Sequence, residues 1–226
     1  MNPALIAFRK ELYGPDKDPA SFSTAKMVGT SLPWAKIPTP RMKAVVKAHA
    51  KDSDLPLEEF PLDESVELTL CYFLFSLKKE GTFEKQMAFL QRKLGNANSW
   101  MITDALPQVI QKAGMEEYQP YYGKWVNDKR EYARRFAYVY ALRYYREKDI
   151  SFFLDHLVYD ERYYVMMAQA WMLATFAITH FEDVVHFLKD PSCPESLFRE
   201  TISKMRDSYR IREDEKEFVK QIRDNR

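Results

Sequence analysis

Apolar residues recur at helical spacing along most of the chain, and capping residues mark where helices begin. Asn2 and Pro3 form a cap and a first-turn proline ahead of the first apolar series. Thr39 and Pro40 repeat the device before a second series. Glycine and proline between the two series limit helix length, so residues 1–50 predict three short helices and a loop.

Longer helices are predicted from residue 63 onward, and their starts recur at intervals of 29 to 36 residues. The predicted starts are Asp63, Ser99, Asp128, Asp160 and Pro194. Each interval has room for two antiparallel helices and a short turn, which is the pattern of a repeat protein. The spacing alone leaves two all-α folds open, an ordinary helical bundle and a solenoid of stacked helix pairs.

Two segments are apolar on almost every side, which is unusual for surface helices. They are YARRFAYVYALRYY, residues 132–145, and YYVMMAQAWMLATFAITHF, residues 163–181. We expect each to pack between neighbouring helices. The last segment, SYRIREDEKEFVKQIRD at residues 208–224, is strongly polar and suits the end of such a stack.

Composition agrees with a helical chain, since glycine is scarce at 6 residues and hydrophobic residues make up 46%. The formal charge is only +1, but it is unevenly distributed. Residues 1–50 hold eight Lys or Arg against three acids, whereas residues 51–67 hold seven acids against one Lys. This segregation fits either ordinary solvated helix faces or a surface that follows DNA phosphates.

The motifs of several other protein classes are missing from the sequence. The two cysteines do not form a disulfide framework, the four histidines lack metal-ligand spacing, and no Gly-rich phosphate loop occurs. Residues 1–14 do not follow the pattern of a charged leader with an apolar core, and no stretch has the length of a membrane span, so we expect neither a leader peptide nor a membrane-spanning helix. We therefore expect a cytoplasmic protein, a monomer, without metal, cofactor or membrane contact.

Trp100 and Asp104 are four residues apart, directly after an Asn98-Ser99 cap signal. On a helix they project from one face and can address one target. The alternative is structural, with Trp100 in the core and Asp104 as a solvated acid near the positive end of the helix dipole. Spacing alone favours that structural interpretation.

Arg134, Arg135 and Trp171 lie inside the two apolar segments. A charged residue there must reach solvent, pair with an acid or bind phosphate. A helix-surface salt bridge is the commoner outcome for such an arginine, and packing between helices is the commoner outcome for Trp171.

Five stretches, taken in order, resemble the bacterial DNA alkylation repair glycosylases that are built from HEAT-like repeats. The stretches are AKIPTPRMKAVVK, NSWMITDAL, WVNDKREYARRFAYVYALRYY, DERYYVMMAQAWMLATFA and SYRIREDEKEFVKQI. The resemblance spans nearly the whole length. It implies an all-α, alpha-alpha superhelix (solenoid) of HEAT-like two-helix repeats with a concave DNA-binding surface. We expect residues 1–226 to be a single domain, with short helices in 1–50 and repeats in 63–226.

The resemblance also assigns roles to individual residues. Trp100 and Asp104 match the family's catalytic tryptophan and essential aspartate, and Trp171 matches the second tryptophan of the cleft. Arg135 matches an arginine of the next repeat, or Arg134 if the alignment shifts by one residue. The segment that holds Thr39, Arg41 and Lys43 matches a helix start that approaches the DNA backbone.

The implied activity is hydrolysis of the N-glycosidic bond of positively charged alkylated purines, such as 3-methyladenine and 7-methylguanine, in duplex DNA. Met167 and Ala174 stand where basic residues often occur in the family, and the charge of +1 is low for a DNA scanner. Two alternatives therefore stay open. One is a noncatalytic binder of distorted or branched DNA, and the other is a HEAT-like protein-interaction scaffold.

Overall fold

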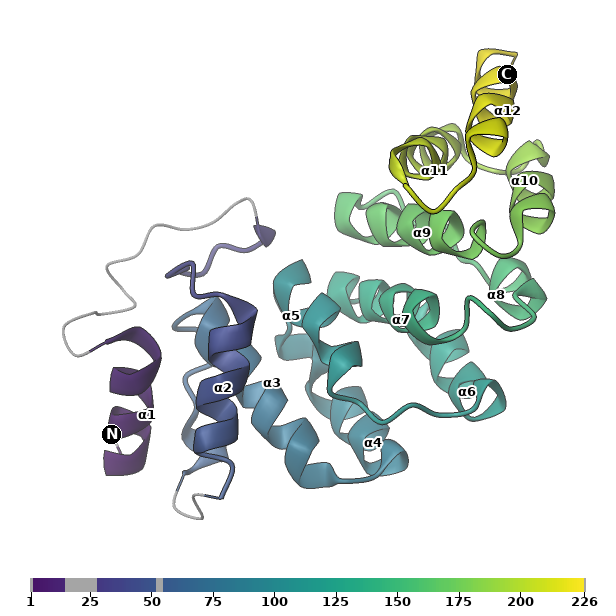
Figure 1. Ribbon diagram of the computed structural model, residues 1–226. Helices are drawn as coiled ribbons and strands as arrows, with labels where there is room; N and C mark the ends of the chain where they lie inside the picture. The colour runs from purple at the N-terminus through teal and green to yellow at the C-terminus, as the bar shows by residue number, and fades with distance from the viewer. Residues whose placement is uncertain (1, 15–27, 52–54, 226) are drawn as a thin grey trace. The chain divides into compact units, whose positions relative to one another are not determined.

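The computed structural model describes residues 2–14, 28–51 and 55–225, and Figure 1 shows its helices. These ranges contain twelve α-helices and a few short 3-10 helices, and no strand. The prediction of an all-α chain is confirmed. No helix in the described ranges combines the length and the apolar character that crossing a membrane requires.

The packing of the chain divides it into two compact units, Met1–Lys112 and Ala113–Arg226. Each unit is described separately below. Because the division concerns packing alone, the expectation of one functional domain over residues 1–226 stays a prediction.

The first unit is built around helix α3, which is buried along most of its length. Its helices are α1 (Pro3–Tyr13), α2 (Thr39–Ala48), α3 (Val66–Glu80), α4 (Phe83–Lys93) and α5 (Trp100–Ala105), with 3-10 turns at Leu57–Glu59, Leu94–Asn96 and Leu106–Gln108. Helix α3 packs against α2, α4 and α5. Every residue from Val66 to Leu77 is buried, which explains why this segment is apolar on all sides.

A buried carboxyl group fixes the loop that leads into α2. Glu67, in the first turn of α3, is 0% exposed, and its Oε1 accepts a hydrogen bond from the Ile37 backbone N–H at 3.4 Å. The backbone N–H of Val66 donates to the carbonyl of Pro33 at 3.2 Å. Burial raises the pKa of Glu67, against the lowering effect of backbone N–H groups in the loop. A charged Glu67 side chain therefore lowers the stability of the fold relative to a neutral one.

The second unit consists of successive helix pairs. Its helices are α6 (Met115–Trp125), α7 (Glu131–Tyr144), α8 (Ser151–Asp155), α9 (Tyr163–Phe176), α10 (Phe181–Lys189), α11 (Glu195–Asp207) and α12 (Glu213–Asp224). Helix α9 packs between α7 and α11, and α12 packs on α11 (Figure 1). The expectation that the apolar segment around Trp171 lies between neighbours is confirmed, and the polar α12 ends the described row.

Two Asp-x-Arg turns, 32 residues apart, introduce α7 and α9. Asp128 Oδ1 accepts hydrogen bonds from the backbone N–H and the Nε of Arg130, each at 2.9 Å. Asp160 Oδ1 accepts the same two bonds from Arg162, also at 2.9 Å. Arg162 also donates to the carbonyl of Lys129 at 2.9 Å, which ties one turn to the other. The turns ahead of α7 and α9 thus share one hydrogen-bond pattern.

The predicted helix starts agree with the structure to within a few residues. Ser99 and Pro194 are the N-caps of α5 and α11. The helices predicted from Asp63, Asp128 and Asp160 each begin three residues later, because each aspartate lies in the turn ahead of its helix.

The predictions for the N-terminal region agree with the structure in part. The side chain of Asn2 caps α1 by accepting a hydrogen bond from Ala4 N at 2.8 Å. Thr39 is the first residue of α2 rather than its cap, which is Pro38. The third short helix predicted within residues 1–50 falls mainly on residues 15–27, outside the described ranges.

Candidate functional site

Ser99 fixes the start of α5, the helix that carries Trp100 and Asp104. Its Oγ accepts a hydrogen bond from Met101 N at 3.1 Å and donates one to the carbonyl of Val28. Ser99 is itself fully buried. The short helix therefore begins at a defined point, held both by its own cap and by a segment seventy-one residues earlier in the sequence.

Trp100 and Asp104 lie on the accessible side of α5. Ile102, Thr103 and Ala105 are buried, whereas Trp100 and Asp104 are each half-buried. The Thr103 hydroxyl lies 3.3 Å from both the Trp100 carbonyl oxygen and Asp104 Oδ1, so it can donate to either. The two predicted catalytic side chains thus share one face, one helical turn apart, and keep partial access to solvent.

Within the same unit, the N-terminal half of α2 carries Thr39, Arg41 and Lys43. Arg41 donates to the carbonyl of Glu11 at 2.9 Å and to that of Leu12 at 3.5 Å, so its guanidinium caps the C-terminal turn of α1. The ammonium of Lys43 donates to the side chain of Gln108, in the 3-10 turn after α5. Lys43 is therefore close to the end of the α5 segment, and Arg41 has a structural partner.

In the second unit, Arg134 is tied to the turn before α9. Its guanidinium donates to the carbonyl of Val158 at 2.8 Å and pairs with Asp160 at 3.1 Å. Its side chain is only 13% exposed. These contacts account for a charged residue in an apolar helix, because the guanidinium links α7 to the turn before α9.

Arg135 reaches in another direction, toward the first turn of α9. Its Nη1 donates to the carbonyl of Tyr164 at 2.6 Å, and the residue is 7% exposed. The rings of Tyr132, on α7, and Tyr164, on α9, have centroids 6.0 Å apart. Arg135 therefore contacts the backbone of α9 at the point where aromatic rings of α7 and α9 meet.

Trp171 lies on the accessible stripe of α9. It is 38% exposed, and it follows the exposed Tyr163 and the half-buried Tyr164 and Met167 at helical spacing. The expectation from sequence pattern alone, packing between helices, does not describe this ring. An exposed tryptophan on an otherwise buried helix is available for contact with a ligand.

Sequence reasoning gave no role to Lys204 of α11. This residue is half-buried, and Arg135 is among the charges that act on it. A lysine at the boundary of an amphipathic helix carries no distinctive sequence signal.

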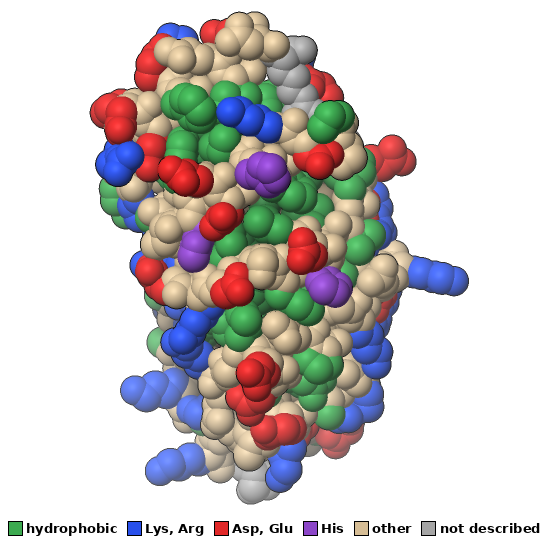
Figure 2. All heavy atoms as spheres, turned by 90° about the vertical axis from the view of Figure 1, so that its right-hand side faces the viewer, with side chains coloured by type: hydrophobic (Ala, Val, Ile, Leu, Met, Phe, Trp, Pro, Cys, Tyr) green, Lys and Arg blue, Asp and Glu red, His purple; other side chains and the backbone are tan. Residues whose placement is uncertain are grey.

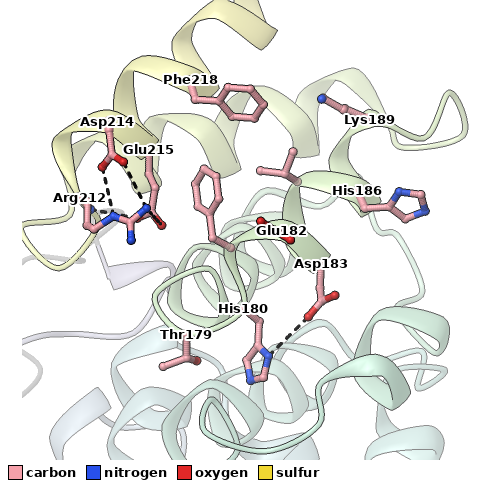
Figure 3. Close-up of a pocket in the computed structure, with 12 residues that line it drawn as sticks. Thr179, His180, Glu182, Asp183, His186, Lys189, Arg212, Asp214, Glu215 and Phe218 are labelled. Carbon is pink, nitrogen blue, oxygen red and sulfur yellow. Dashed lines mark hydrogen bonds and ion pairs between the residues drawn. The ribbon is translucent and has the colours of Figure 1, made fainter.

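The second unit also has an open groove of about 890 Å³ between α10 and α12, shown in Figure 3. Phe181, Val185 and Phe218 line it together with charged residues. Several of these charges have partners nearby: His180 lies 3.5 Å from Asp183, and Arg212 pairs with Asp214 at 3.1 Å. None of the predicted site residues lines this groove.

Figure 2 shows the side of the molecule that includes α10 and α12. Hydrophobic, acidic and histidine side chains are interspersed on it, without a continuous cluster of Lys and Arg. Such a mixed surface does not favour the phosphate backbone of DNA. In the described part of the chain, no group of three or more His, Cys, Asp or Glu residues is placed to hold a metal ion.

Comparison with known proteins gives one positive result. Residues 20–205 match the family model described as DNA alkylation repair enzyme. The match covers the helices that carry Trp100, Asp104, Arg134, Arg135 and Trp171. No curated protein matches the chain.

Proposed function

Because the chain belongs to the DNA alkylation repair enzyme family, we propose that it is a DNA glycosylase that releases positively charged alkylated purines from duplex DNA. Its substrates would include 3-methyladenine and 7-methylguanine. The observation that carries this proposal is the placement of Trp100 and Asp104 on the accessible face of one short, firmly capped helix.

Asp104 has the chemistry that this reaction needs. When the bond between the purine nitrogen and C1′ breaks, its electron pair neutralises the cationic base and positive charge develops on the sugar. A fixed carboxylate stabilises that oxocarbenium-like transition state more than the ground state. Water then bonds to C1′ and releases a proton to solvent, which gives the free base and an abasic site. Because the alkylated purine is already a good leaving group, a general acid is not required.

The aromatic residues explain the preference for positive charge. The face of Trp100 attracts a cationic purine or the developing sugar cation through cation-π contact, worth about 1 kcal/mol. Trp171 offers a second exposed aromatic face to bound DNA. Neutral bases gain less from such faces, so cationic lesions are favoured.

Arg135 is the proposed phosphate contact, with Arg134 as the alternative if the alignment with the family shifts by one residue. Arg134 is engaged by Asp160 and the Val158 carbonyl. Arg135 is also engaged, since it donates to the Tyr164 carbonyl in the first turn of α9. Thr39 and Lys43 remain proposed backbone contacts at the start of α2, where Arg41 acts in part by holding α1.

We also propose that the helix pairs are HEAT-like repeats of a solenoid. The row of α7, α9 and α11 within residues 113–226 supports this, as do the two equivalent Asp-x-Arg turns that precede α7 and α9.

The test is release of free base from duplex DNA that contains 7-methylguanine. We expect wild-type protein to release base well above the spontaneous rate and Asp104→Asn to be slower by about 10²-fold or more. Asp155→Asn, which changes an exposed acid on α8, serves as the matched control and should match wild type. No release by wild-type protein overturns the glycosylase proposal. Salt-sensitive binding without release would instead identify a noncatalytic DNA binder.

A further inference from the structure

Lys36 has a backbone conformation that residues with a side chain rarely adopt. Its φ is 60°, and it is the one residue other than glycine with a positive φ in the ranges that the structure describes. This left-handed conformation brings Cβ close to the following carbonyl oxygen, which destabilises the fold for most residues other than glycine and asparagine. Strain of this kind persists only where the surroundings impose it, and it clusters at functional sites.

The first turn of α3 imposes the conformation of Lys36. On one side of the residue, the carbonyl of Pro33 accepts a hydrogen bond from the N–H of Val66 at 3.2 Å. On the other side, the N–H of Ile37 donates to the buried carboxyl group of Glu67 at 3.4 Å. The loop is therefore fixed on both sides of Lys36, and a fixed loop loses little conformational entropy when a ligand binds to it.

The ammonium of Lys36 is accessible to a ligand. The residue is exposed, and its Nζ lies 6.0 Å from the centroid of the half-buried Trp34 ring, at the outer limit of a cation-π contact. Among residues 2–14, 28–51 and 55–225, no carboxylate pairs with this ammonium. An exposed cation on a fixed loop, without an acidic partner there, suits an anionic ligand such as a DNA phosphate.

Two contacts attach this part of the chain to the α5 segment. Before the loop, the carbonyl of Val28 accepts the hydrogen bond from Ser99, the cap of α5. After the loop, the ammonium of Lys43 donates to Gln108, in the 3-10 turn that follows α5. Lys36 lies between these two attachment points, and Figure 1 shows the segment that leads into α2 at the same end of the first unit as α5.

We propose that Lys36 is a further contact for the DNA backbone, binding a phosphate close to the nucleotide on which Trp100 and Asp104 act. This inference rests on the proposed function, because it takes duplex DNA as the ligand. It also explains the strained conformation, which lowers stability but presents a cation from a fixed loop beside the proposed catalytic helix.

The salt dependence of DNA binding tests the inference. Binding of the full-length protein to a fluorescently labelled, undamaged duplex is measured by anisotropy from about 50 to about 200 mM NaCl. The main variant is Lys36→Asn, because asparagine tolerates the left-handed conformation and carries no charge. We expect it to reduce the slope of log K against log salt by about 0.9, the value for one lost phosphate contact. Lys36→Arg keeps the cation and should keep the wild-type slope.

A matched variant controls for net charge. Lys85→Asn also replaces an exposed lysine, in the first turn of α4. Helix α4 follows the C-terminal end of α3, whereas the loop with Lys36 is bound to the first turn of α3. Lys85→Asn should therefore leave the slope unchanged.

Thermal unfolding separates binding from structure. Lys36→Asn should melt no lower than wild type, because asparagine relieves the strain of the left-handed conformation. Stability is then kept or raised while DNA binding weakens. A lysine that served the fold alone would show the reverse, a lower melting temperature with an unchanged slope, and that result would overturn the inference.

The remaining outcomes distinguish this inference from the proposed function. A wild-type slope in Lys36→Asn, while wild-type protein binds DNA and releases base, overturns the role of Lys36 alone. Equal loss of slope in Lys36→Asn and Lys85→Asn also overturns it, because the effect would then reflect net charge. A reduced slope in Lys36→Arg contradicts the assignment to charge. Failure of wild-type protein to bind duplex DNA at low salt overturns both proposals.

Discussion

Of the two Asp-x-Arg turns, the one at Asp160 should contribute more to the stability of the fold, because Asp160 pairs with two arginines. The Asp160 side chain is 6% exposed and pairs with Arg162 at 2.5 Å and with Arg134 at 3.1 Å. Asp128, in the equivalent turn, is 16% exposed and pairs with Arg130, whose side chain is 40% exposed. The substitutions Asp160→Asn and Asp128→Asn therefore make a matched pair that differs mainly in the number and burial of the arginines.

The expected loss for Asp160→Asn is about 3 kcal/mol. Removing one partner from a buried ion pair typically costs roughly 3–5 kcal/mol, because the remaining charge is left uncompensated. The lower end applies here, since Arg162 is 37% exposed and Arg134 keeps its bond to the Val158 carbonyl. Asp128→Asn disrupts a pair with one arginine, which is 40% exposed, and should cost about 1 kcal/mol. For a chain of this size the two losses correspond to drops in Tm of about 6–12 °C and about 2–4 °C.

Urea unfolding followed by circular dichroism at pH 7 measures both losses. A second measurement compares the stability of wild type and Asp160→Asn as the pH is lowered. Burial tends to raise the pKa of Asp160, but hydrogen bonds and charge from Arg162, together with Arg134, hold it below its usual value. The stabilisation is thus present above the unfolded pKa of about 3.9 and is lost as pH falls through the folded pKa. The difference between wild type and Asp160→Asn should shrink on acidification. Equal losses for the two substitutions at pH 7, or a pH-independent difference, would refute the reasoning.

Two further substitutions test the first unit. Ser99→Ala removes the cap of α5 and the bond to the Val28 carbonyl, so unfolding free energy measured in urea should fall by about 1–2 kcal/mol; an unchanged value would contradict the role given to this cap. Glu67→Gln tests the buried loop anchor. Burial raises the pKa of Glu67 above 4.5, so the carboxylate increasingly destabilises the fold as pH rises past that value. The stability of Glu67→Gln relative to wild type should increase from about pH 4 to about pH 7, and a constant or falling difference would contradict this assignment.

Local signals in the sequence were sufficient to predict several helix starts. Caps and first-turn prolines act on neighbouring residues, so Ser99 and Pro194 could be recognised without knowledge of the fold. Asp128 and Asp160 show the limit of this reasoning. They have the residue type of an N-cap, but each accepts hydrogen bonds from the arginine two residues later, and the helix begins only after that turn.

The features of the candidate site that depend on packing could not be predicted. Pattern alone placed Trp171 between helices because its segment is apolar on all sides, whereas the structure leaves the ring 38% exposed. The choice between Arg134 and Arg135 depends on which carbonyl each guanidinium reaches, 24 and 29 residues along the chain.

The central claim is that Asp104 stabilises the cationic transition state of base release, and single-turnover kinetics test it most directly. Wild-type protein and Asp104→Asn are compared on the same 7-methylguanine duplex, with enzyme in excess and with binding to the duplex measured in parallel. The account predicts that the release rate falls by about 10²-fold or more while DNA affinity stays within a few-fold of wild type. Equal release rates for the two proteins would contradict it.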